Sequence, residues 1–190
     1  MLNEITINAH SSIRIGCSKV VWFDPYLLKE EYHDADAVFI THDHFDHYSE
    51  EDLKKVLKEG TVVVTPENAD TVKIPGLAFE TVPAYNIGKK FHPKENGWLG
   101  YVVTVDRVRY YVAGDTDVTP ELLEVHSDVA MLPVGGKYTM TAKEAAEAAE
   151  KMDVPVFIPT HYGSVVGDGS EGEAFRSLLA GKKEVVLKIQ

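Results

Sequence analysis

The sequence predicts an α/β domain in which two mixed β-sheets face each other and helices cover their outer faces. Short β-type segments with apolar residues at alternate positions fill much of the first half of the chain. Strand–helix–strand units follow in the second half. Such elements bury their apolar sides when the sheets pack on each other and the helices pack outside them. The 190 residues suffice for one core and contain no repeat or linker, so we expect a single domain over residues 1–190.

Isoleucines mark the first two expected strands. Ile5 and Ile7 fall on alternate positions, as do Ile13 and Ile15, which is the period of half-buried strands. Short apolar runs, typical of strands buried on both faces, follow at residues 20–23, 37–40 and 61–65.

The second half is expected to add a hairpin and further strands. The hairpin has its turn at Asp106–Arg107, between β-rich runs at residues 101–105 and 108–112. The remaining expected strands lie at residues 129–134, 154–158 and 185–189.

Three segments have the pattern of amphipathic helices, at residues 49–59, 141–152 and 171–179. Ser49 and Thr141 are the expected N-caps of the first two. Each is followed three positions later by an acidic residue, Asp52 or Glu144, that can complete a capping box. Gly60 is expected to end the first helix.

Acidic residues outnumber basic ones, 30 to 19, which gives a net charge of −11. A nucleic-acid groove needs clustered Lys and Arg, so this balance argues against a nucleic-acid partner. A small anionic substrate stays compatible with it, because bound metal ions can dominate the local field.

Cys17 is the only cysteine, which excludes an internal disulfide and suits a reducing compartment. We interpret it as a small buried apolar residue. No charged segment followed by an apolar one stands at the start, and no apolar run approaches the ~20 residues of a membrane span. These features predict a cytoplasmic protein with no membrane partner.

The strongest chemical signal is the pattern His-x-His-x-Asp-His at residues 42–47, directly after an expected buried strand. By chance, a chain of this length and composition would hold on the order of 10⁻³ copies. His42 and His44 are two apart in an extended segment, so they point to the same side. Imidazole and carboxylate groups gathered in this way suit a transition metal, and without a cation their burial would be costly. The motif therefore predicts a metal site.

The segment resembles the His-x-His-x-Asp-His signature of the metallo-β-lactamase superfamily. Gly114-Asp115 is similar to the Gly-Asp motif of that superfamily, and Pro-Thr-His-Tyr-Gly at residues 159–163 is similar to its last histidine motif. Each follows an apolar strand, and the resemblance spans residues 5–161. It implies an αββα sandwich and a metal-dependent hydrolase.

Finer matches indicate a branch of the superfamily. The segments around His10 (Asn-Ala-His-Ser-Ser), Asp24 (Phe-Asp-Pro) and Tyr138 (Leu-Pro-Val-Gly-Gly-Lys-Tyr-Thr-Met) resemble proteins similar to L-ascorbate-6-phosphate lactonase and related metal-dependent hydrolases. This resemblance implies hydrolysis of an ester, lactone or phosphoester bond in a small-molecule substrate.

The resemblance also implies a dinuclear metal site. Six residues would hold its ions: His42 and His44 the first, Asp46, His47 and His161 the second, with Asp115 between them. The ions would be divalent transition metals, with Zn²⁺ the first choice and Mn²⁺, Fe²⁺ or Ni²⁺ as alternatives. A metal-bound hydroxide with a pKa near neutral would be the nucleophile. Asp46 and Asp115 would be the catalytic carboxylates, and Asp46 could orient the hydroxide.

One position departs from the pattern of the superfamily. A third histidine usually completes the first site and, in the related hydrolases, follows a Pro-Ala-Tyr-like segment. Here residues 83–85 are followed by Asn86, and the nearest histidine is His92. We favour His92 as the third ligand, because a catalytic metal usually takes three protein ligands. A surface histidine at this position, with a poorer first site, is the alternative.

Three further residues are expected near the metals. His10 and Asp24 would hold ligand side chains or, for His10, contact substrate; an ordinary strand-end histidine and a turn or helix-capping residue are the alternatives. Tyr138 is the third of these residues. Like Tyr162, which also lies beside a matched motif, it would either face the cleft or pack in the core or at the rim. His33 and His126 lie outside every motif and are expected at the surface.

Two other functions stay open at this point. One is a phosphodiesterase or nuclease with the same fold, against which the acidic charge argues. The other is a metal-binding protein without hydrolytic activity. A homo-oligomer is compatible with the sequence but not indicated by it.

Overall fold

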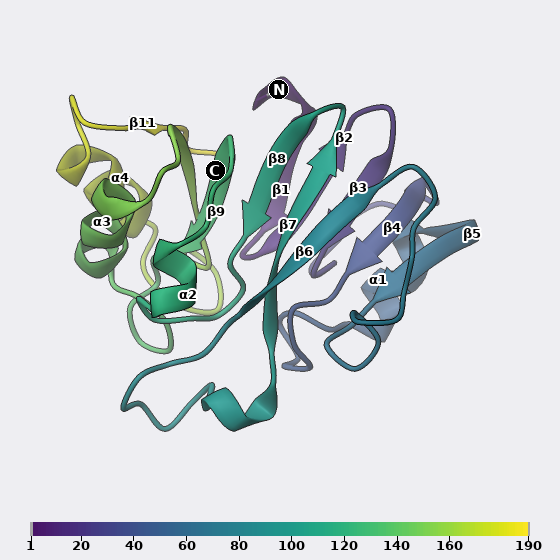
Figure 1. The fold of residues 1–190 in the computed structure, drawn as a ribbon, viewed down its shortest axis with the longest axis horizontal. Coiled ribbons are helices and arrows are strands. Elements are labelled where there is room, and N and C mark those ends of the chain that lie inside the picture. The colour runs from purple at the N-terminus through teal and green to yellow at the C-terminus, as the bar shows by residue number, and fades with distance from the viewer. Residues whose placement is uncertain (1, 190) are drawn as a thin grey trace.

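The computed structural model describes residues 2–189. Within them the strands form two sheets that face each other (Figure 1). The first sheet has the order β1-β2-β3-β4-β5, with β1 at Ile5–Ala9, β2 at Ser12–Gly16, β3 at Val20–Phe23, β4 at Ala35–Phe39 and β5 at Leu57–Val64. The second has the order β11-β10-β9-β8-β7-β6, with β6 at Ala78–Pro83, β7 at Leu99–Val105, β8 at Val108–Val112, β9 at Val129–Pro133, β10 at Val156–Thr160 and β11 at Glu184–Val185.

The main core lies between the sheets and follows from the period-2 alternation of the strands. Val21 and Phe23 of β3 point into it, whereas Trp22 points to the opposite face. From the second sheet, Tyr101 and Ile158 enter the same core. The side chains on both faces of β3 are therefore buried, as the apolar run at residues 20–23 predicts.

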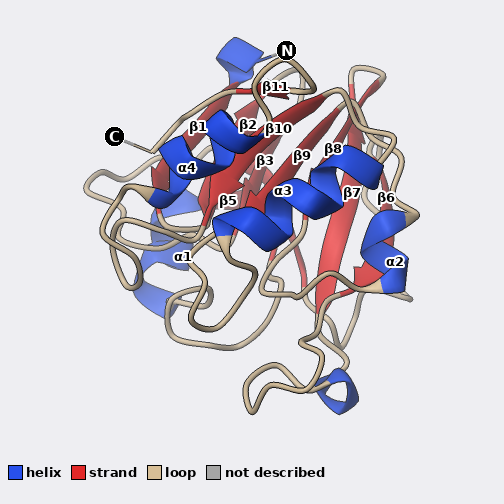
Figure 2. Cartoon of the chain, turned by 90° about the vertical axis from the view of Figure 1, so that its left-hand side faces the viewer, coloured by secondary structure: helices blue, strands red, loops and turns tan. Residues whose placement is uncertain are grey.

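Helices cover the outer face of each sheet. The first sheet is covered by α1 (Glu50–Val56), and the second by α2 (Pro120–Leu123), α3 (Ala142–Lys151) and α4 (Glu171–Leu178). Figure 2 shows α2, α3 and α4 on one side of the second sheet. Two single 3-10 turns complete the elements, at Leu2–Glu4 and Lys94–Asn96. Two mixed sheets with helices outside them confirm the predicted fold class.

The predicted first helix is too long. It ends at Val56, and Leu57–Val64 form the strand β5, so the predicted strand at 61–65 starts four residues earlier. Asp52 also does not complete a capping box: its backbone N–H donates to the Ser49 side chain, but its carboxylate accepts from the backbone of Leu27 and Leu28 instead. Tertiary contacts with a neighbouring loop override the local capping pattern here.

The predictions for the second half need smaller corrections. Asp106 and Arg107 both have positive φ, 50° and 68°, as a two-residue hairpin turn requires. The capping box of α3 is complete. The closing strand is only two residues long, at Glu184–Val185, rather than residues 185–189. The pattern at residues 78–83 and 120–123 gave no prediction, although these residues form β6 and α2.

The carboxyl ends of parallel strands from both sheets meet at one edge of the sandwich. In the first sheet β3 and β4 are parallel. In the second, β8, β9 and β10 are parallel. Loops that follow these strands open on the same face, which is where α/β sheets bind ligands. Among residues 2–189, no helix is long and apolar enough to span a membrane.

Candidate metal centre

The His-x-His-x-Asp-His motif forms the loop between β4 and α1. His42 and His44 leave the end of β4 with their rings 4.7 Å apart, and His42 Nε2 lies 3.2 Å from His44 Nδ1. The chain then turns back, with the backbone N–H of His47 donating to the carbonyl of His44. Asp46 and His47 therefore face the same region from the turn, and both are buried.

Asp115 reaches this region from the other sheet, just after β8. Gly114 gives the chain its sharp turn, with φ of 65°, and a Cβ there would lie 3.0 Å from Thr41. Only glycine fits both demands without strain. The Gly-Asp motif thus brings the Asp115 carboxylate next to the β4–α1 loop that carries the histidines.

His161 follows β10 and is also held by a close backbone approach. A Cβ on Gly135 would lie 2.2 Å from the His161 carbonyl oxygen, so a larger residue there would displace the histidine. The backbone N–H of His161 donates to the carbonyl of His10, which joins the end of β10 to the first hairpin.

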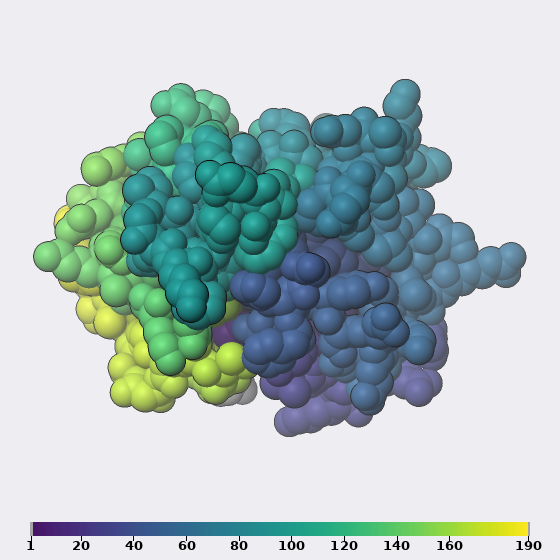
Figure 3. All heavy atoms as spheres, turned by 90° about the horizontal axis from the view of Figure 1, so that it is seen from below, coloured from purple at the N-terminus to yellow at the C-terminus, as the bar shows by residue number. Residues whose placement is uncertain are grey.

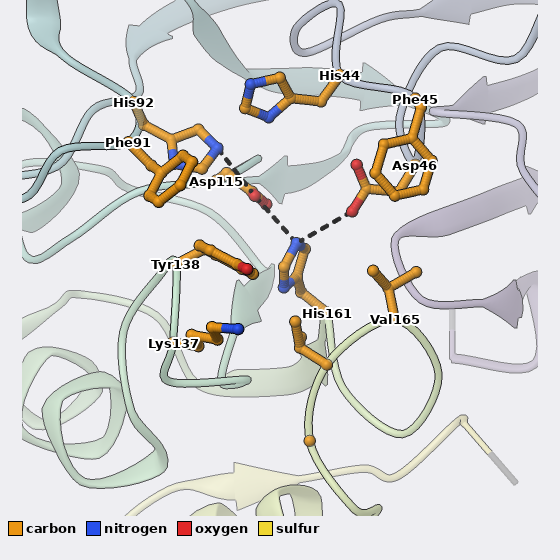
Figure 4. Close-up of a pocket in the computed structure, with 12 residues that line it drawn as sticks. His44, Phe45, Asp46, Phe91, His92, Asp115, Lys137, Tyr138, His161 and Val165 are labelled. Carbon is orange, nitrogen blue, oxygen red and sulfur yellow. Dashed lines mark ion pairs between the residues drawn. The ribbon is translucent and has the colours of Figure 1, made fainter.

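Asp115 is the point at which the candidate ligands meet. Its Oδ1 lies 3.2 Å from His47 Nε2, and its Oδ2 lies 3.0 Å from His161 Nε2. His92 Nε2 and His42 Nε2 lie 3.2 and 4.0 Å from the same Oδ2. Figure 4 shows His92 and His161 pointing at Asp115 from different loops.

Three overlapping groups have ligand atoms within 4.8 Å of one another and could each hold an ion: His42, His44 and His92; His42, His47 and Asp115; and His10, Asp46, His47 and His161. The first and third groups contain the two ligand sets that the sequence predicted, and Asp115 lies between them. The structure therefore brings all seven predicted ligands together.

His92 rather than Asn86 faces the centre. The amide nitrogen of Asn86 lies 2.6 Å from the carbonyl oxygen of Tyr138, 3.0 Å from that of Phe91 and 3.2 Å from His92 Nδ1. Asn86 is thus used to hold the loop that carries His92. This loop lies between β6 and β7, and the backbone of His92 takes the left-handed conformation, with φ of 59°.

Asp24 braces the buried end of the centre. Its carboxylate accepts from the backbone N–H of Thr41 at 2.8 Å and from the Thr41 hydroxyl at 2.7 Å. It also accepts from His47 Nδ1 at 2.7 Å, which leaves Nε2 of that ring directed to Asp115. Thr41 directly precedes the motif, and the sequence analysis did not assign it a role.

His10 braces Asp46 in a similar way. His10 Nε2 lies 3.1 Å from Asp46 Oδ2, and Ser164 Oγ lies 3.2 Å from His10 Nδ1. The His10 ring also packs against that of His161, with centroids 3.9 Å apart. Ser164 stands in a loop whose sequence gave no signal of a role.

The charges of the centre are strongly coupled. Burial lowers the pKa of His42 well below its usual value, and His47 lowers it further, so the His42 ring is neutral and offers a lone pair. Burial also lowers the pKa of His47, but the carboxylates of Asp115 and Asp24 outweigh this and raise it well above the usual value. Burial raises the pKa of Asp115, yet His161 and His47 hold it well below the usual range.

These residues fit a bound cation. Several buried side-chain atoms make no hydrogen bond within residues 2–189: His47 Nε2, His92 Nε2, His161 Nδ1, His161 Nε2 and Asp115 Oδ1. Buried polar atoms normally have a partner, and leaving one without costs about 1–3 kcal/mol. The contacts of His47 and His161 with Asp115 are short but not aligned as hydrogen bonds. The Nε2 atoms of His47, His92 and His161 converge on the Asp115 carboxylate without forming hydrogen bonds, which is an arrangement that a metal ion can bind.

Comparison with known proteins agrees with this geometry. The sequence profile of the beta-lactamase superfamily domain matches residues 4–161, which is most of the chain. The chain belongs to the metallo-β-lactamase superfamily.

Similar proteins place it more closely within the superfamily. A Thermococcus onnurineus protein named UPF0173 metal-dependent hydrolase is 30% identical, over 97% of this chain and 95% of that protein. A candidate metal-dependent hydrolase of known structure from Parabacteroides distasonis has a TM-score of 0.82 at 29% identity, over 98% of this chain and 93% of that one. Igni18, a metallo hydrolase from Ignicoccus hospitalis, shares the fold with a TM-score of 0.75 at 23% identity, over 97% and 94%.

In this member of the metallo-β-lactamase superfamily, a pocket of about 530 Å³ opens beside the candidate ligands. Such a volume suits a small molecule. Its walls come from five loops and contain the following residues: His44, Phe45, Asp46, Phe91, His92, Asp115, Lys137, Tyr138, His161, Val165, Val166 and Gly167. In Figure 3, which views this face, the blue, teal and yellow-green surfaces of these loops meet around the hollow.

The remaining sequence-predicted residues fall in different places. Tyr138 lines the pocket, whereas Tyr162 is buried in the core between the second sheet and its helices. His33 and His126 are exposed. Cys17 is half-buried, with its sulfur 3.8 Å from the Tyr110 hydroxyl.

Proposed function

We propose that this chain is a hydrolase that uses two divalent transition-metal ions, Zn²⁺ first among them, to cleave an ester, lactone or phosphoester bond of a small metabolite. One observation carries the proposal: His47, His92 and His161, held by loops of both sheets, converge on Asp115 with Nε2 atoms that are buried and make no hydrogen bond within residues 2–189. The relatives named metal-dependent hydrolases support it.

The candidate ligands form two sets, one for each ion. His42, His44 and His92 would hold one ion, and Asp46, His47 and His161 the other, with Asp115 shared. When bound, such ions lower the pKa of a coordinated water to near neutral and polarise the bond that breaks.

The other residues position this machinery. Asp24 accepts from His47 Nδ1 and so fixes which nitrogen of that ring faces the centre. Burial raises the pKa of Asp46, but the hydrogen bond with His10 and the charge of His47 outweigh this and lower it. Asp46 is therefore ionised near neutral pH and, because it lines the pocket, can accept a proton from the attacking water. Tyr138 lines the same pocket, and its hydroxyl can donate a hydrogen bond to the substrate.

The proposal is tested by metal content and turnover measured together. Purified protein should hold about two ions per chain by elemental analysis, since a dinuclear site needs two. It should hydrolyse at least one member of a panel of p-nitrophenyl esters, aromatic lactones and bis-p-nitrophenyl phosphate, and lose turnover on chelation. The phosphodiester distinguishes a phosphodiesterase from an esterase or lactonase.

Asp115→Ala provides the residue-level test. It should lower metal content and reduce kcat/KM by about a thousandfold or more, because the cations supply several kcal/mol of stabilisation. His126→Ala is the matched control, since His126 is exposed and, within residues 2–189, its ring pairs with Asp153 and with no other acidic residue. Unchanged metal content in Asp115→Ala would show that the site assignment is wrong. Full metal loading with no turnover on any substrate would favour a metal-binding protein without hydrolytic activity.

A further inference from the structure

We propose that the substrate is a small amphipathic anion, whose anionic group binds Lys137 and Tyr138 on one side of the metal centre while its apolar group packs on Phe45 and Val165 on the other. This inference rests on the proposed function of the same pocket and specifies its substrate class.

Lys137 is the only lysine or arginine that lines the pocket. Its side chain is exposed, and within residues 2–189 its ammonium makes no hydrogen bond or ion pair but lies over the Tyr138 ring, 4.9 Å from the centroid. Two nearby lysines are paired, Lys89 with Asp117 and Lys94 with Glu121, and Lys90, which is unpaired, does not line the pocket. In a chain of net charge −11, a cation left without an acidic partner at the pocket is available to a ligand.

The opposite wall is apolar although it is exposed: Phe45 is 67% exposed and Val165 38%. Phe91, 45% exposed, lines the same pocket from the other side, where its ring lies 4.9 Å from that of Tyr138 between centroids (Figure 4). These three are among only seven large apolar side chains that are exposed in residues 2–189, and all three line this pocket. Exposed apolar surface gathered in this way indicates a binding site. Phe45 stands between two candidate ligands, His44 and Asp46, so the metal loop itself holds it at the pocket mouth.

The two kinds of wall lie on opposite sides of the reacting centre. In Figure 4, Lys137 and Tyr138 lie on one side of His161, and Phe45 and Val165 lie on the other. A bond held beside His161 and Asp115 would therefore have one flanking group near an ammonium and a phenol, and the other near apolar side chains. Two bound divalent cations would outweigh the carboxylates of Asp46 and Asp115, so the field of the loaded site would also favour an anion.

A pair of esters tests the anionic side. p-Nitrophenyl hydrogen glutarate carries a carboxylate and an aromatic ring on opposite sides of its ester bond, and p-nitrophenyl pentanoate replaces the carboxylate by a methyl group. The measured quantity is the ratio of kcat/KM for the glutarate to that for the pentanoate, on zinc-loaded protein and after subtraction of the rate without protein. Lys137→Gln should lower this ratio about tenfold, the effect of losing roughly 1.4 kcal/mol. Added salt should lower it in wild type and less in the variant.

Lys90→Gln is the matched control. Lys90 is exposed, makes no hydrogen bond or ion pair within residues 2–189, and stands beside Phe91 without lining the pocket. Lys90→Gln removes the same charge as Lys137→Gln but from outside the pocket. The ratio of the two kcat/KM values should therefore stay at the wild-type value. An equal fall in both variants would mean a general effect of charge, and an unchanged ratio in Lys137→Gln would mean a solvated lysine. Either result would overturn the inference.

A second substitution tests the apolar side of the pocket. Val165→Ser should raise KM severalfold for both esters, because the aromatic ring is common to them, and should leave their ratio unchanged. Leu178→Ser is the control, since Leu178 is at least as exposed as Val165 but lies on α4 outside the pocket. No change in KM for Val165→Ser would contradict the apolar half of the inference.

A binding measurement separates this inference from the proposed function. If neither ester is hydrolysed, the hydrolase proposal fails for this class of ester, and the substrate class is tested by calorimetry with 4-phenylbutyrate on zinc-loaded protein. The Kd should rise about tenfold in Lys137→Gln and stay unchanged in Lys90→Gln. Equal Kd values in wild type and Lys137→Gln would overturn the inference whatever the turnover shows.

Discussion

The two halves of the candidate metal centre are held in different ways. The inner half consists of Asp46, His47 and His161, all buried at the ends of strands or on the turn into α1. The outer half consists of His42, His44 and His92. In it His44 is only partly buried, and His92 comes from the long β6–β7 loop. One half is thus built into the sandwich, and the other depends in part on a loop that packs over it.

The residues that support each half differ in the same sense. In the inner half, His47 is held by Asp24, a fully buried carboxylate at the end of β3 that also accepts two hydrogen bonds from Thr41. In the outer half, His92 is held through its loop, because Asn86, a neutral amide in the same loop, donates its two amide hydrogens to the carbonyls of Phe91 and Tyr138. A charged partner fixed by a sheet orients a ring more firmly than a neutral partner that moves with it. We expect the inner ion to bind more tightly and the outer one to vary in occupancy.

Removing one histidine from each half tests this difference directly and has the largest expected effect. Substitution of a residue that only supports a metal ligand lowers metal affinity by up to about 100-fold. His161→Ala removes a ligand itself, so it should lower the affinity for the inner ion by more than that. His92→Ala should abolish the outer ion and leave about one ion per chain that resists dialysis. Both are measured by elemental analysis during titration with a chelator.

The opposite order of metal loss would contradict this expectation. If His92→Ala loses both ions while His161→Ala keeps one, the loop half is the tighter of the two. His126→Ala controls for the loss of any histidine, because it lies outside the centre and is exposed.

The sequence predicted the inner half better than the outer half for a physical reason. His47 and His161 of the inner half follow buried strands, as does His42 of the outer half, and strand ends at one edge of a sandwich must come together. His92 stands in a loop, where neither periodicity nor propensity fixes the path of the chain. Its placement depends on hydrogen bonds from Asn86 to the carbonyls of Phe91 and Tyr138, and the second of these partners lies 52 residues away.

The limits of the fold prediction have a similar origin. Strands with regular alternation, such as those of Ile5 and Ile13, and the complete capping box of Thr141 were predicted because their signals are local. The early end of α1 was not predicted, since Leu57 leaves the helix to begin β5 and pairs with Ala35 of β4, a contact that local periodicity does not show. The left-handed backbones of His10 and His161 carry no signature in the sequence either, and such strained positions gather at functional sites.

Replacing one supporting residue in each half should have a smaller effect on metal affinity than removing a ligand. Asp24→Asn should lower the affinity for the inner ion about 10–100-fold, because His47 loses its charged partner. Asn86→Ala should lower the affinity for the outer ion by less, since a neutral amide holds His92 and Asn86 itself is not a ligand. Metal titration with a competing chelator gives both values.

Thermal unfolding provides the control for these two variants. Asp24 is buried and accepts three hydrogen bonds, so Asp24→Asn should also lower the Tm of the metal-free protein. If the metal affinity in Asp24→Asn equals that of wild type while only the Tm falls, Asp24 is a structural residue and does not position His47 for the metal.

The smallest effect is expected far from the centre, where stability and metal binding should separate. Thr141 accepts from the backbone N–H of Glu144 and begins α3, which packs on the outer face of the second sheet. Thr141→Ala should cost about 1 kcal/mol, or roughly 2–4 °C in Tm, with unchanged metal content. Ser170→Ala is the matched control, because Ser170 precedes α4 without capping it and should cost less. A loss of metal in Thr141→Ala would mean that the outer helices also position the ligands, and the contrast between a rigid inner half and a loop-borne outer half would then be incomplete.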